Sequence, residues 1–206
     1  MGRPEDHILC DAIDRLGNGL ADGGHLEDAL SVQEAELAML RRVGVSEERM
    51  LTAQSNLAVI YSELGLHEKA LPLKRDVYSE TLKLLGEENR ETIVAANNYA
   101  ATLLDVHRYA EAKSLLLETI SVVRRVLGEN SDILLKMKHK YAQTLYEDPE
   151  ATLEDLREAV TTLEELEPIV RRVLGGAHPL TTILVGDVRL MRLTLHARET
   201  PSPRSS

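Results

Sequence analysis

A segment of 42 residues recurs along this chain, and its period limits the folds that the chain can adopt. Leu85-Gly86 and Leu127-Gly128 carry the same pair of residues, and the two glycines lie 42 residues apart. The stretch between them reads as two helices separated by a turn, and the same unit can be laid over the sequence on either side. Self-similarity at a fixed period is typical of repeat proteins, in which each unit buries its apolar face against its neighbours. The sequence therefore predicts a stack of helical hairpins.

Small residues recur at two places in this unit and set its register. One place holds a triplet that ends in alanine and returns every 42 residues: Asn56-Leu57-Ala58, Asn98-Tyr99-Ala100 and Lys140-Tyr141-Ala142. The other place holds an alanine near the start of each second helix: Ala29, Ala70, Ala112 and Ala159. Because the distance between packed helices depends on the side chains at the contact, we expect these alanines to bring paired helices close together.

Apolar periodicity and turn residues predict where the helices lie. Residues 4–43 form a first hairpin, interrupted at Gly23-Gly24, and its second helix carries Leu30, Leu37 and Leu40 on one side. The first helix of this hairpin has apolar residues at four-residue steps, which we expect to form one stripe: Ile8, Ala12, Leu16 and Leu20. The further helices are predicted at 47–64, 68–85, 92–106, 109–127, 132–146, 152–174 and 179–198.

Capping residues support these boundaries. Gly44 can take the positive φ that ends a helix, and Ser46 can cap the helix that follows. In the fourth unit the closing glycines, Gly128 and Gly175, lie 47 residues apart, and the extra residues fall in the turn. After that turn, Thr152 with Asp155 three residues on resembles a capping box.

Two prolines fall within predicted helices. Pro72 is expected near the start of its helix, where a missing amide does little harm. Pro168 is expected well inside its helix, where an unrelieved proline costs about 3 kcal/mol, so we expect a kink or a break there.

The charge balance and the single cysteine exclude several classes of protein. Among 206 residues the chain has 34 acidic and 24 basic side chains, a net charge of −10, which argues against nucleic-acid binding. Cys10 cannot form an internal disulfide, and it reads as a small buried thiol. No run of 18 apolar residues, secretion signal or myristoylation signal is recognisable, so we expect a cytoplasmic protein without a membrane contact.

The sequence offers little for catalysis. It contains no metal-protease histidine pair, no Gly-rich phosphate loop and no nucleophile elbow, so we expect no enzymatic activity, no cofactor and no metal. The acidic run at Glu164-Glu165 and Glu167 reads as solvated helix surface. Residues 200–206 have nothing apolar to bury and are predicted to be disordered, with Thr200-Pro201 and Ser202-Pro203 as possible kinase sites.

The repeat resembles the tetratricopeptide repeat in the 42-residue version found in kinesin light chains. The stretch NLAVIYSELGLHEKALPLKRDVY is similar to that family's pattern, and the Leu-Gly-Glu-Glu-Asn and Leu-Gly-Gly-Ala-His-Pro segments are similar to its linkers. The resemblance is close over 47–199 and weaker over 8–44, where Gly17 and Leu20 stand in for alanine and tyrosine.

The resemblance implies an all-α fold, a right-handed superhelix of about four helical hairpins with a C-terminal capping helix. It implies one domain over 4–199, with repeats at 8–44, 47–86, 92–128 and 132–175 and the capping helix at 179–198. The capping helix bears Asp187, Arg189 and Arg192. First helices would line a concave groove.

The resemblance also implies which residues face this groove, counted from the small alanine of each first helix. By unit, with the first one less certain in register, they are Asp11, Arg15 and Asn18; Thr52, Ser55, Asn56 and Val59; Val94, Asn97, Asn98 and Ala101; and Lys136, His139, Lys140 and Gln143. An asparagine amide can both donate to and accept from an extended peptide backbone. Lys136, His139 and Lys140 share one helix face, and the alternative is that these cations are an ordinary solvated surface. The candidate partner-binding residues are Asn56, Asn97, Asn98, Lys136, His139 and Lys140.

The function predicted from this groove is a non-enzymatic protein-interaction adaptor that binds an extended, acidic partner segment as a monomer or weak homo-oligomer. Some proteins of the family clamp the terminal carboxylates of chaperones, but Ser55 and Val59 replace two of the five donors, so we do not expect that clamp here. The alternatives are an architectural subunit or spacer that binds through its convex face or ends, and a folded inhibitor of an enzyme.

Overall fold

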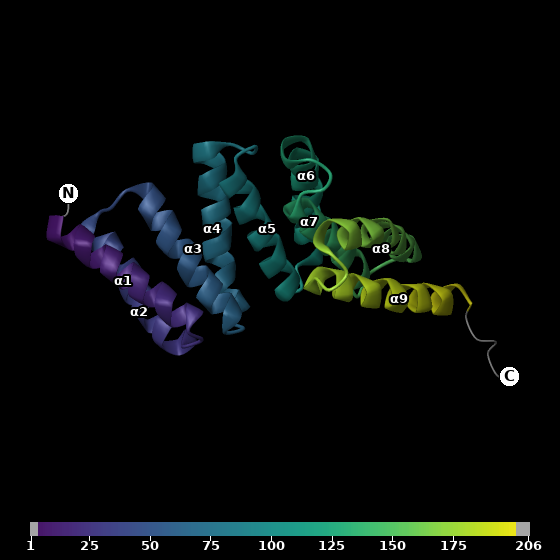
Figure 1. The fold of residues 1–206 in the computed structure, drawn as a ribbon, viewed down its shortest axis with the longest axis horizontal. Helices are drawn as coiled ribbons and strands as arrows, with labels where there is room; N and C mark the ends of the chain where they lie inside the picture. The colour runs from purple at the N-terminus through teal and green to yellow at the C-terminus, as the bar shows by residue number, and fades with distance from the viewer. Residues whose placement is uncertain (1–3, 201–206) are drawn as a thin grey trace. The chain divides into compact units, whose positions relative to one another are not determined.

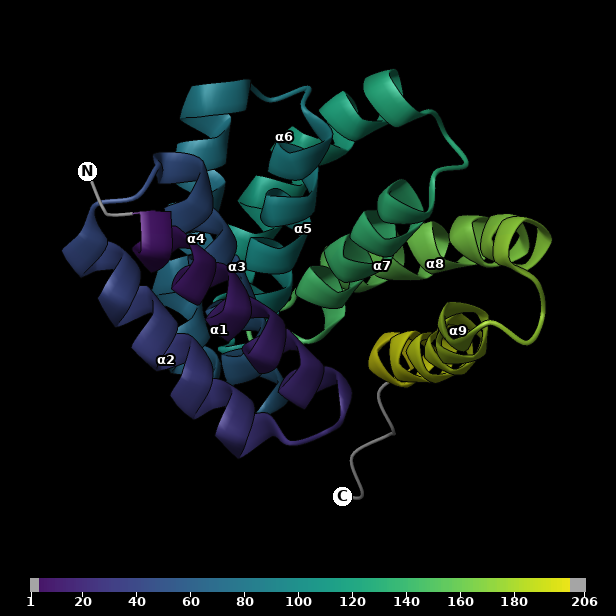
Figure 2. The same cartoon turned by 60° about the vertical axis from the view of Figure 1, so that its left-hand side comes forward.

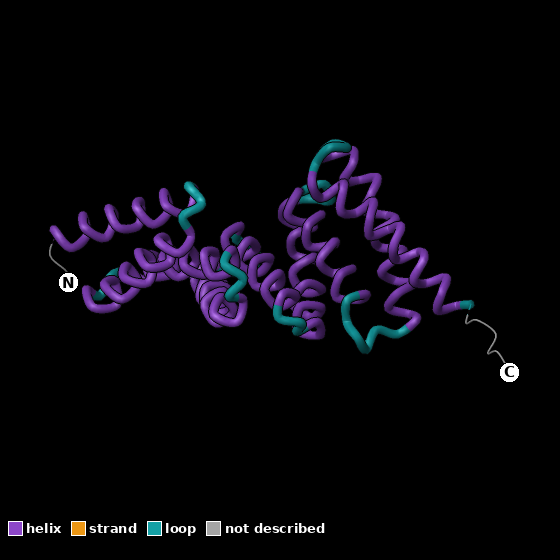
Figure 3. The backbone as a smooth tube through the Cα atoms, turned by 90° about the horizontal axis from the view of Figure 1, so that it is seen from below, coloured by secondary structure: helices purple, strands orange, loops and turns teal. Residues whose placement is uncertain are grey.

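The computed structural model describes residues 4–200, and it describes side chains from residue 8 onward. The tail prediction for 201–206, with its Ser202-Pro203 motif, lies outside the described residues. Residues 4–200 form nine α-helices joined by short turns (Figures 1 and 3). Their bounds are α1 Pro4–Asp22, α2 Leu26–Val43, α3 Glu47–Glu63, α4 His67–Leu85, α5 Arg90–Asp105, α6 Tyr109–Leu127, α7 Asp132–Tyr146, α8 Leu153–Leu174 and α9 Pro179–Glu199. No helix among them is long and apolar enough to cross a membrane.

The chain divides into two compact units, Met1–Gly86 and Glu87–Ser206. In the first unit α1 packs on α2, α2 on α3, and α3 on α4. In the second unit α5 to α9 pack in the same consecutive way, and α5 and α7 also touch directly (Figure 2). The predicted all-α class and its antiparallel hairpins are confirmed, whereas the predicted single domain over 4–199 stays a prediction.

The small-residue slots lie at the centre of each hairpin. The seven alanines of these slots that the sequence places in register are completely buried, with 0% exposure: Ala29, Ala58, Ala70, Ala100, Ala112, Ala142 and Ala159. Around Ala70 the first unit gathers Leu37, Leu40 and Leu57. Around Ala142 the second unit gathers a larger apolar cluster that joins α7, α8 and α9. Burial of these aliphatic side chains, at about 25 cal/mol per Å² of apolar surface, drives the pairing of the helices.

The predicted apolar stripe of α1 is wrong. Ile8 is 70% exposed, Leu16 is 55% exposed and Ala12 is also exposed, whereas Cys10 and Gly17 are buried. A four-residue step advances about 40° beyond one helical turn, so positions 8 to 20 sweep around the helix instead of marking one face. The face that packs on α2 passes through Gly17, where an added Cβ would lie 2.7 Å from Nε2 of Gln33. Glycine therefore fills the small-residue slot of this hairpin.

The helix caps form as the sequence predicts, but the prolines do not have the predicted effects. The Ser46 hydroxyl accepts a hydrogen bond from the Arg49 amide at 3.4 Å, Thr152 and Asp155 form a reciprocal capping box, and Gly44 ends α2 at φ 72°. Helix α8 runs unbroken through Pro168, so the expected break is absent. Buried Leu166 and Val170 hold the helix on both sides of this exposed proline.

Pro72 lies deeper in its helix than predicted. Helix α4 begins at His67, and the Ala70 amide already donates to the Leu66 carbonyl at 3.1 Å. Pro72 therefore follows the first turn and removes one hydrogen bond of the helix interior.

A left-handed residue is required at the turn after α3. Gly65 has φ 71°, its amide donates to the Ser62 carbonyl, and the Leu66 amide donates to the Tyr61 carbonyl. His107, 42 residues later, takes the same conformation at φ 59°. An added Cβ at Gly65 would meet no atom within 4 Å, so a substitution there would act through the backbone alone.

We expect Gly65→Ala to lower the free energy of unfolding by about 1–2 kcal/mol, the cost of the left-handed region for an L-residue. The matched control is Gly19→Ala, in the last turn of α1, where a Cβ also meets nothing within 4 Å. There alanine should raise stability by as much as about 1 kcal/mol through helix propensity. Urea denaturation of both variants checks this, and a shift of the same sign in both would contradict it.

Candidate functional site

The candidate site on the second unit is a polar face shared by α5 and α7. Helix α5 buries Ile93, Ala96 and Ala100, which leaves Asn97 and Asn98 half-buried at its other side. Helix α7 repeats the pattern 42 residues later, and it leaves Lys136 and Lys140 half-buried. Since α5 and α7 touch directly, the asparagines and the lysines lie on neighbouring helices.

A hydrogen bond joins the two helices at this face. The Lys140 ammonium donates to Oδ1 of Asn97, with 3.1 Å between Nζ and Oδ1. The pKa of Lys140 falls to about 8, first because burial disfavours its charge and second because Lys136 lies nearby, while Asp105 opposes the shift. Lys140 makes no ion pair with a described residue. It is therefore a cation, still mostly protonated at neutral pH, that no carboxylate neutralises by direct contact.

Lys136 occupies a more ordinary surface position. Its ammonium lies 3.0 Å from Oδ2 of Asp132, one turn earlier on the same helix. This hydrogen bond to Lys136 is the main cause that lowers the pKa of Asp132. The two side chains are 43% and 50% exposed, and pairs exposed to this degree contribute about 0.5 kcal/mol, so the Lys136 ammonium can exchange its partner at little cost.

Asn98 leaves its side-chain amide unused. Its backbone carbonyl accepts a hydrogen bond from the Thr102 hydroxyl at 3.3 Å, but its side chain makes none with any described residue. The half-buried amide therefore offers two donor hydrogens and an acceptor oxygen beside Lys140.

His139 lies inside the protein instead of on this face. The residue is 7% exposed, and its Nε2 lies 2.7 Å from Oδ2 of Asp187 on α9. The Tyr146 hydroxyl donates to the same oxygen at 3.2 Å. Burial, and next the charge of Asp187, raise the pKa of Tyr146 above its usual range. These contacts attach α9 to α7, a role that helix spacing alone does not reveal.

Asn56, the remaining predicted site residue, belongs to the first unit and is engaged there. Its Nδ2 donates to Oδ1 of Asp14 at 3.0 Å, and Asn18 donates to the same oxygen at 3.2 Å. Gln33 in turn donates to Oδ1 of Asn18 at 3.2 Å. The structure thus brings Asn97, Asn98, Lys136 and Lys140 together and places Asn56 in a separate network.

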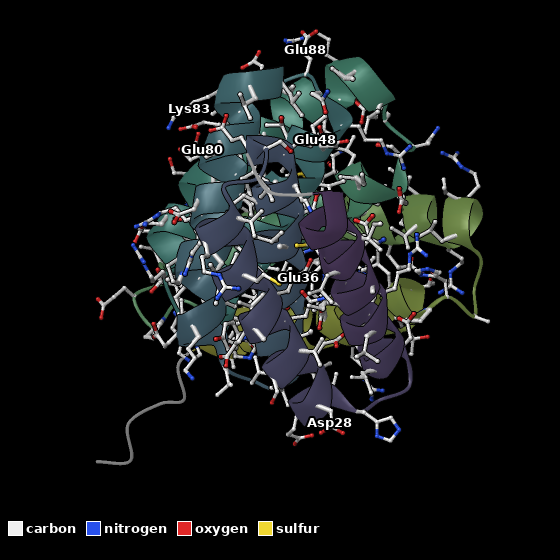
Figure 4. All side chains as sticks on the ribbon, turned by 90° about the vertical axis from the view of Figure 1, so that its left-hand side faces the viewer. Asp28, Glu36, Glu48, Glu80, Lys83 and Glu88 are labelled. Atoms are coloured by element: carbon white, nitrogen blue, oxygen red, sulfur yellow. The ribbon has the colours of Figure 1, made fainter. Side chains whose placement is uncertain are left out.

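Two buried polar residues of α2 were not predicted from the sequence. Gln33 is 0% exposed and Glu36 is 2% exposed, and each has one side-chain oxygen without a hydrogen-bond partner among the residues whose side chains the structure describes. Figure 4 marks Glu36 where α1 and α2 face each other. The pKa of Glu36 is raised to about 7, first by burial and next by the charge of Asp14, with Asp11 adding to the shift and Arg49 opposing it. The signal that could have found it is the interruption of the Leu30–Leu37–Leu40 face by a glutamate.

The described residues offer no site for a metal ion, because no three or more His, Cys, Asp or Glu side chains gather to hold one. What the geometry defines is a helical-repeat protein: hairpins with alanine-filled contacts that present polar first-helix faces.

Comparison with known proteins agrees with this class. Residues 50–91 and 92–132 each match the family model of the tetratricopeptide repeat. No curated protein matches the chain. Among solved structures, a variant of a Podosopora anserina kinesin light chain with nearly identical TPR-like repeats aligns with a TM-score of 0.73 at 19% identity, over 92% of this chain and 87% of that one.

Two further structures show the same fold. Another crystal structure of the Podosopora anserina repeats gives a TM-score of 0.68 at 18% identity, over 95% of this chain and 97% of that one. BtubC (BKLC) from P. vanneervenii gives 0.58 at 16% identity, over 98% of this chain and 86% of that one. The chain thus contains two tetratricopeptide repeats, over residues 50–91 and 92–132, and its fold is similar to that of the kinesin light chain-like repeats in the solved structures. Tetratricopeptide repeats typically serve as scaffolds for protein–protein interaction.

We expect the stability of the first unit to fall as pH rises from about 4.5 to about 7. Glu36 binds its proton more tightly in the folded protein, with a pKa of about 7 against 4.5, so its stabilisation is complete below the lower value and lost above the upper one. The loss is about 3 kcal/mol at most. Hydrogen exchange of the α1–α3 amides, corrected for intrinsic rates, measures it.

Glu36→Gln should remove this pH dependence, whereas Glu27→Gln, an exposed change on the same helix, should keep it. Equal profiles for the wild type and Glu36→Gln would show that Glu36 is not the titrating group.

Proposed function

We propose that this protein is a non-enzymatic interaction adaptor that holds an extended, acidic segment of a partner protein on the α5/α7 face of its second unit. The observation that carries the proposal is Lys140. Its ammonium is half-buried, is oriented by Asn97 and has no carboxylate in direct contact. The chain has a net charge of −10, yet this ammonium contacts none of the described carboxylates. It is therefore available to bind an anionic group of another molecule.

The neighbouring groups suit an extended backbone that carries such an acid. The free amide of Asn98 can donate to a peptide carbonyl and accept from a peptide N–H, as a backbone-reading residue must. Lys136, one turn from Lys140, can exchange Asp132 for a partner carboxylate. Each hydrogen bond to a charged group contributes about 1.5–3 kcal/mol, so two or three of them support a modest, salt-sensitive affinity.

His139 and Asn56 do not contribute donors to the proposed contact. His139 is committed to Asp187, and Asn56 to Asp14. The binding face that we propose is therefore smaller than the six residues predicted from the repeat pattern: Asn97, Asn98, Lys136 and Lys140.

We expect Asn98→Ala and Lys140→Gln each to weaken capture of the partner by about tenfold, the equivalent of about 1.4 kcal/mol. The partner is first isolated on the wild-type chain and identified by mass spectrometry, and its acidic segment is then titrated by calorimetry. The matched control is Lys138→Gln, because Lys138 lies on the same helix but pairs with Glu129.

Thermal melts must show that these variants keep the wild-type fold. Unchanged affinity in folded Asn98→Ala and Lys140→Gln would contradict the proposal. If light scattering then revealed a defined oligomer that contains the partner, the architectural role would be the better description.

We also expect binding to weaken as pH rises through about 8, because Lys140 loses its proton there while carboxylates stay charged. Affinity for the acidic segment should fall by several-fold between about pH 7 and pH 9. Lys140→Arg should bind with little change over the same range, since a guanidinium stays protonated. A pH dependence that is identical in wild type and Lys140→Arg would show that another group titrates.

A further inference from the structure

A second candidate surface lies in the groove between α8 and α9, helices that run side by side in the second unit (Figure 1). The groove encloses about 570 Å³. Helix α9 lines it with Val185, Val188, Arg189, Arg192 and Leu193, and α8 lines it with Glu164, Glu167 and Arg171. The α9 residues are spaced i, i+3, i+4, i+7 and i+8, so they form one face of that helix.

The repeat register shows which residues of α7, the first helix of the preceding hairpin, correspond to this face of α9. The offset of 47 residues between Gly128 and Gly175 carries Tyr141 and Ala142 of α7 onto Val188 and Arg189 of α9. In α7 these positions receive the second helix of the hairpin: Tyr141 donates a hydrogen bond to Glu158 of α8, and Ala142 packs in the cluster with α8. Among residues 4–200 no second helix packs on the equivalent position of α9: Arg189 is exposed, and Val188 is half-buried against the core.

This face differs chemically from its counterpart. The buried alanine slot holds the exposed Arg189, and the slot of the buried Leu145 holds Arg192. Arginine at the small-residue slot prevents the close backbone contact of an ordinary hairpin. A helix that binds here must therefore lie further from the axis of α9 and contact the guanidinium group of Arg189. The apolar floor remains, because Val185 and Leu193 are 44% and 62% exposed.

Helix α9 is also apolar on two sides. Leu180, Leu184 and Met191 face the core, whereas Leu190 and Leu193 are 56% and 62% exposed on the outside. A helix with apolar residues on two sides can pack between two partners. Exposed apolar residues gathered along a groove mark an interaction surface.

The charges around the floor indicate the partner's chemistry. Arg192 pairs with Glu164 at 2.5 Å and Arg171 pairs with Glu167 at 2.6 Å, so both glutamates are already used. Arg189 has no carboxylate partner among the described residues. A complementary partner would therefore supply one carboxylate for Arg189 and apolar side chains to cover Val185, Val188 and Leu193.

We propose that the α8/α9 groove docks a single amphipathic helix of a protein partner, with an apolar stripe on the floor and an acidic residue at Arg189. A helix is the fitting occupant because α8 itself fills the equivalent site on α7, and helix-in-groove contact reads residues at this i, i+3, i+4, i+7 spacing. This surface is independent of the α5/α7 face.

The experiment uses the full chain and two synthetic amphipathic helices with the same leucine stripe, one flanked by glutamates and one flanked by lysines. Fluorescence anisotropy should show that the glutamate-flanked helix binds at least about tenfold more tightly. Arg189→Glu and Leu193→Asp should each remove that binding, and methyl resonances of Val185, Val188 and Leu193 should shift on titration. Lys140→Gln, which impairs only the α5/α7 face, should leave it unchanged.

The matched control for Leu193→Asp is Leu117→Asp, an exposed leucine of α6 outside the groove. Binding that survives Arg189→Glu and Leu193→Asp would overturn the proposal, as would loss of binding in Leu117→Asp. Sedimentation velocity tests the other occupant: a self-associating chain that Leu193→Asp returns to monomer would assign the groove to a second copy instead.

Discussion

The close contact between the two helices of each hairpin is the constraint on which the remaining structure depends. An alanine lies on each side of that contact in the second, third and fourth hairpins, and every one of these alanines is fully buried. With a methyl group at the contact, two helix backbones approach until the larger leucines and valines above and below them interlock. That contact sets which face of each first helix is buried, and therefore which residues remain on its polar face.

Departures from the small-residue slot mark the unusual parts of the molecule. In the first hairpin Gly17 replaces alanine and lets the side chain of Gln33 approach, which creates room for a buried polar network instead of an apolar contact. Glu36 is buried beside this network, and its raised pKa is the electrostatic consequence. In α9 Arg189 fills the slot, and an exposed groove with charged walls replaces the buried contact. The hairpins between them keep alanine and present lysine and asparagine outward.

Predictability from the sequence differed sharply between kinds of feature. Helix ends at Gly44, Ser46 and Thr152 were predictable because a cap is a local interaction between residues a few positions apart. The Ile8–Leu20 stripe was not, because a periodic pattern does not say which side of a helix its neighbour occupies. Pro168 was judged by its local cost, and the buried Leu166 and Val170 around it outweigh that cost. Of the candidate site, the position of Asn97, Asn98 and the two lysines on first-helix faces was expected from the resemblance to the repeat family, but the inward turn of His139 was not.

The sequence by itself determined the hairpin architecture, since recurring glycines and alanines act through backbone geometry and close packing within one repeat. It also determined that Lys140 of α7 occupies the register position that Asn98 holds in α5. Only the tertiary structure decided which of these side chains are available. His139 is hydrogen-bonded to Asp187 of α9 and Asn56 to Asp14 of α1, so neither side chain is available to a partner. Lys140 is oriented by its hydrogen bond to Asn97 of α5. Each of these contacts joins residues more than 40 positions apart, so its energy depends on how separate helices pack and not on the residues beside it in the chain.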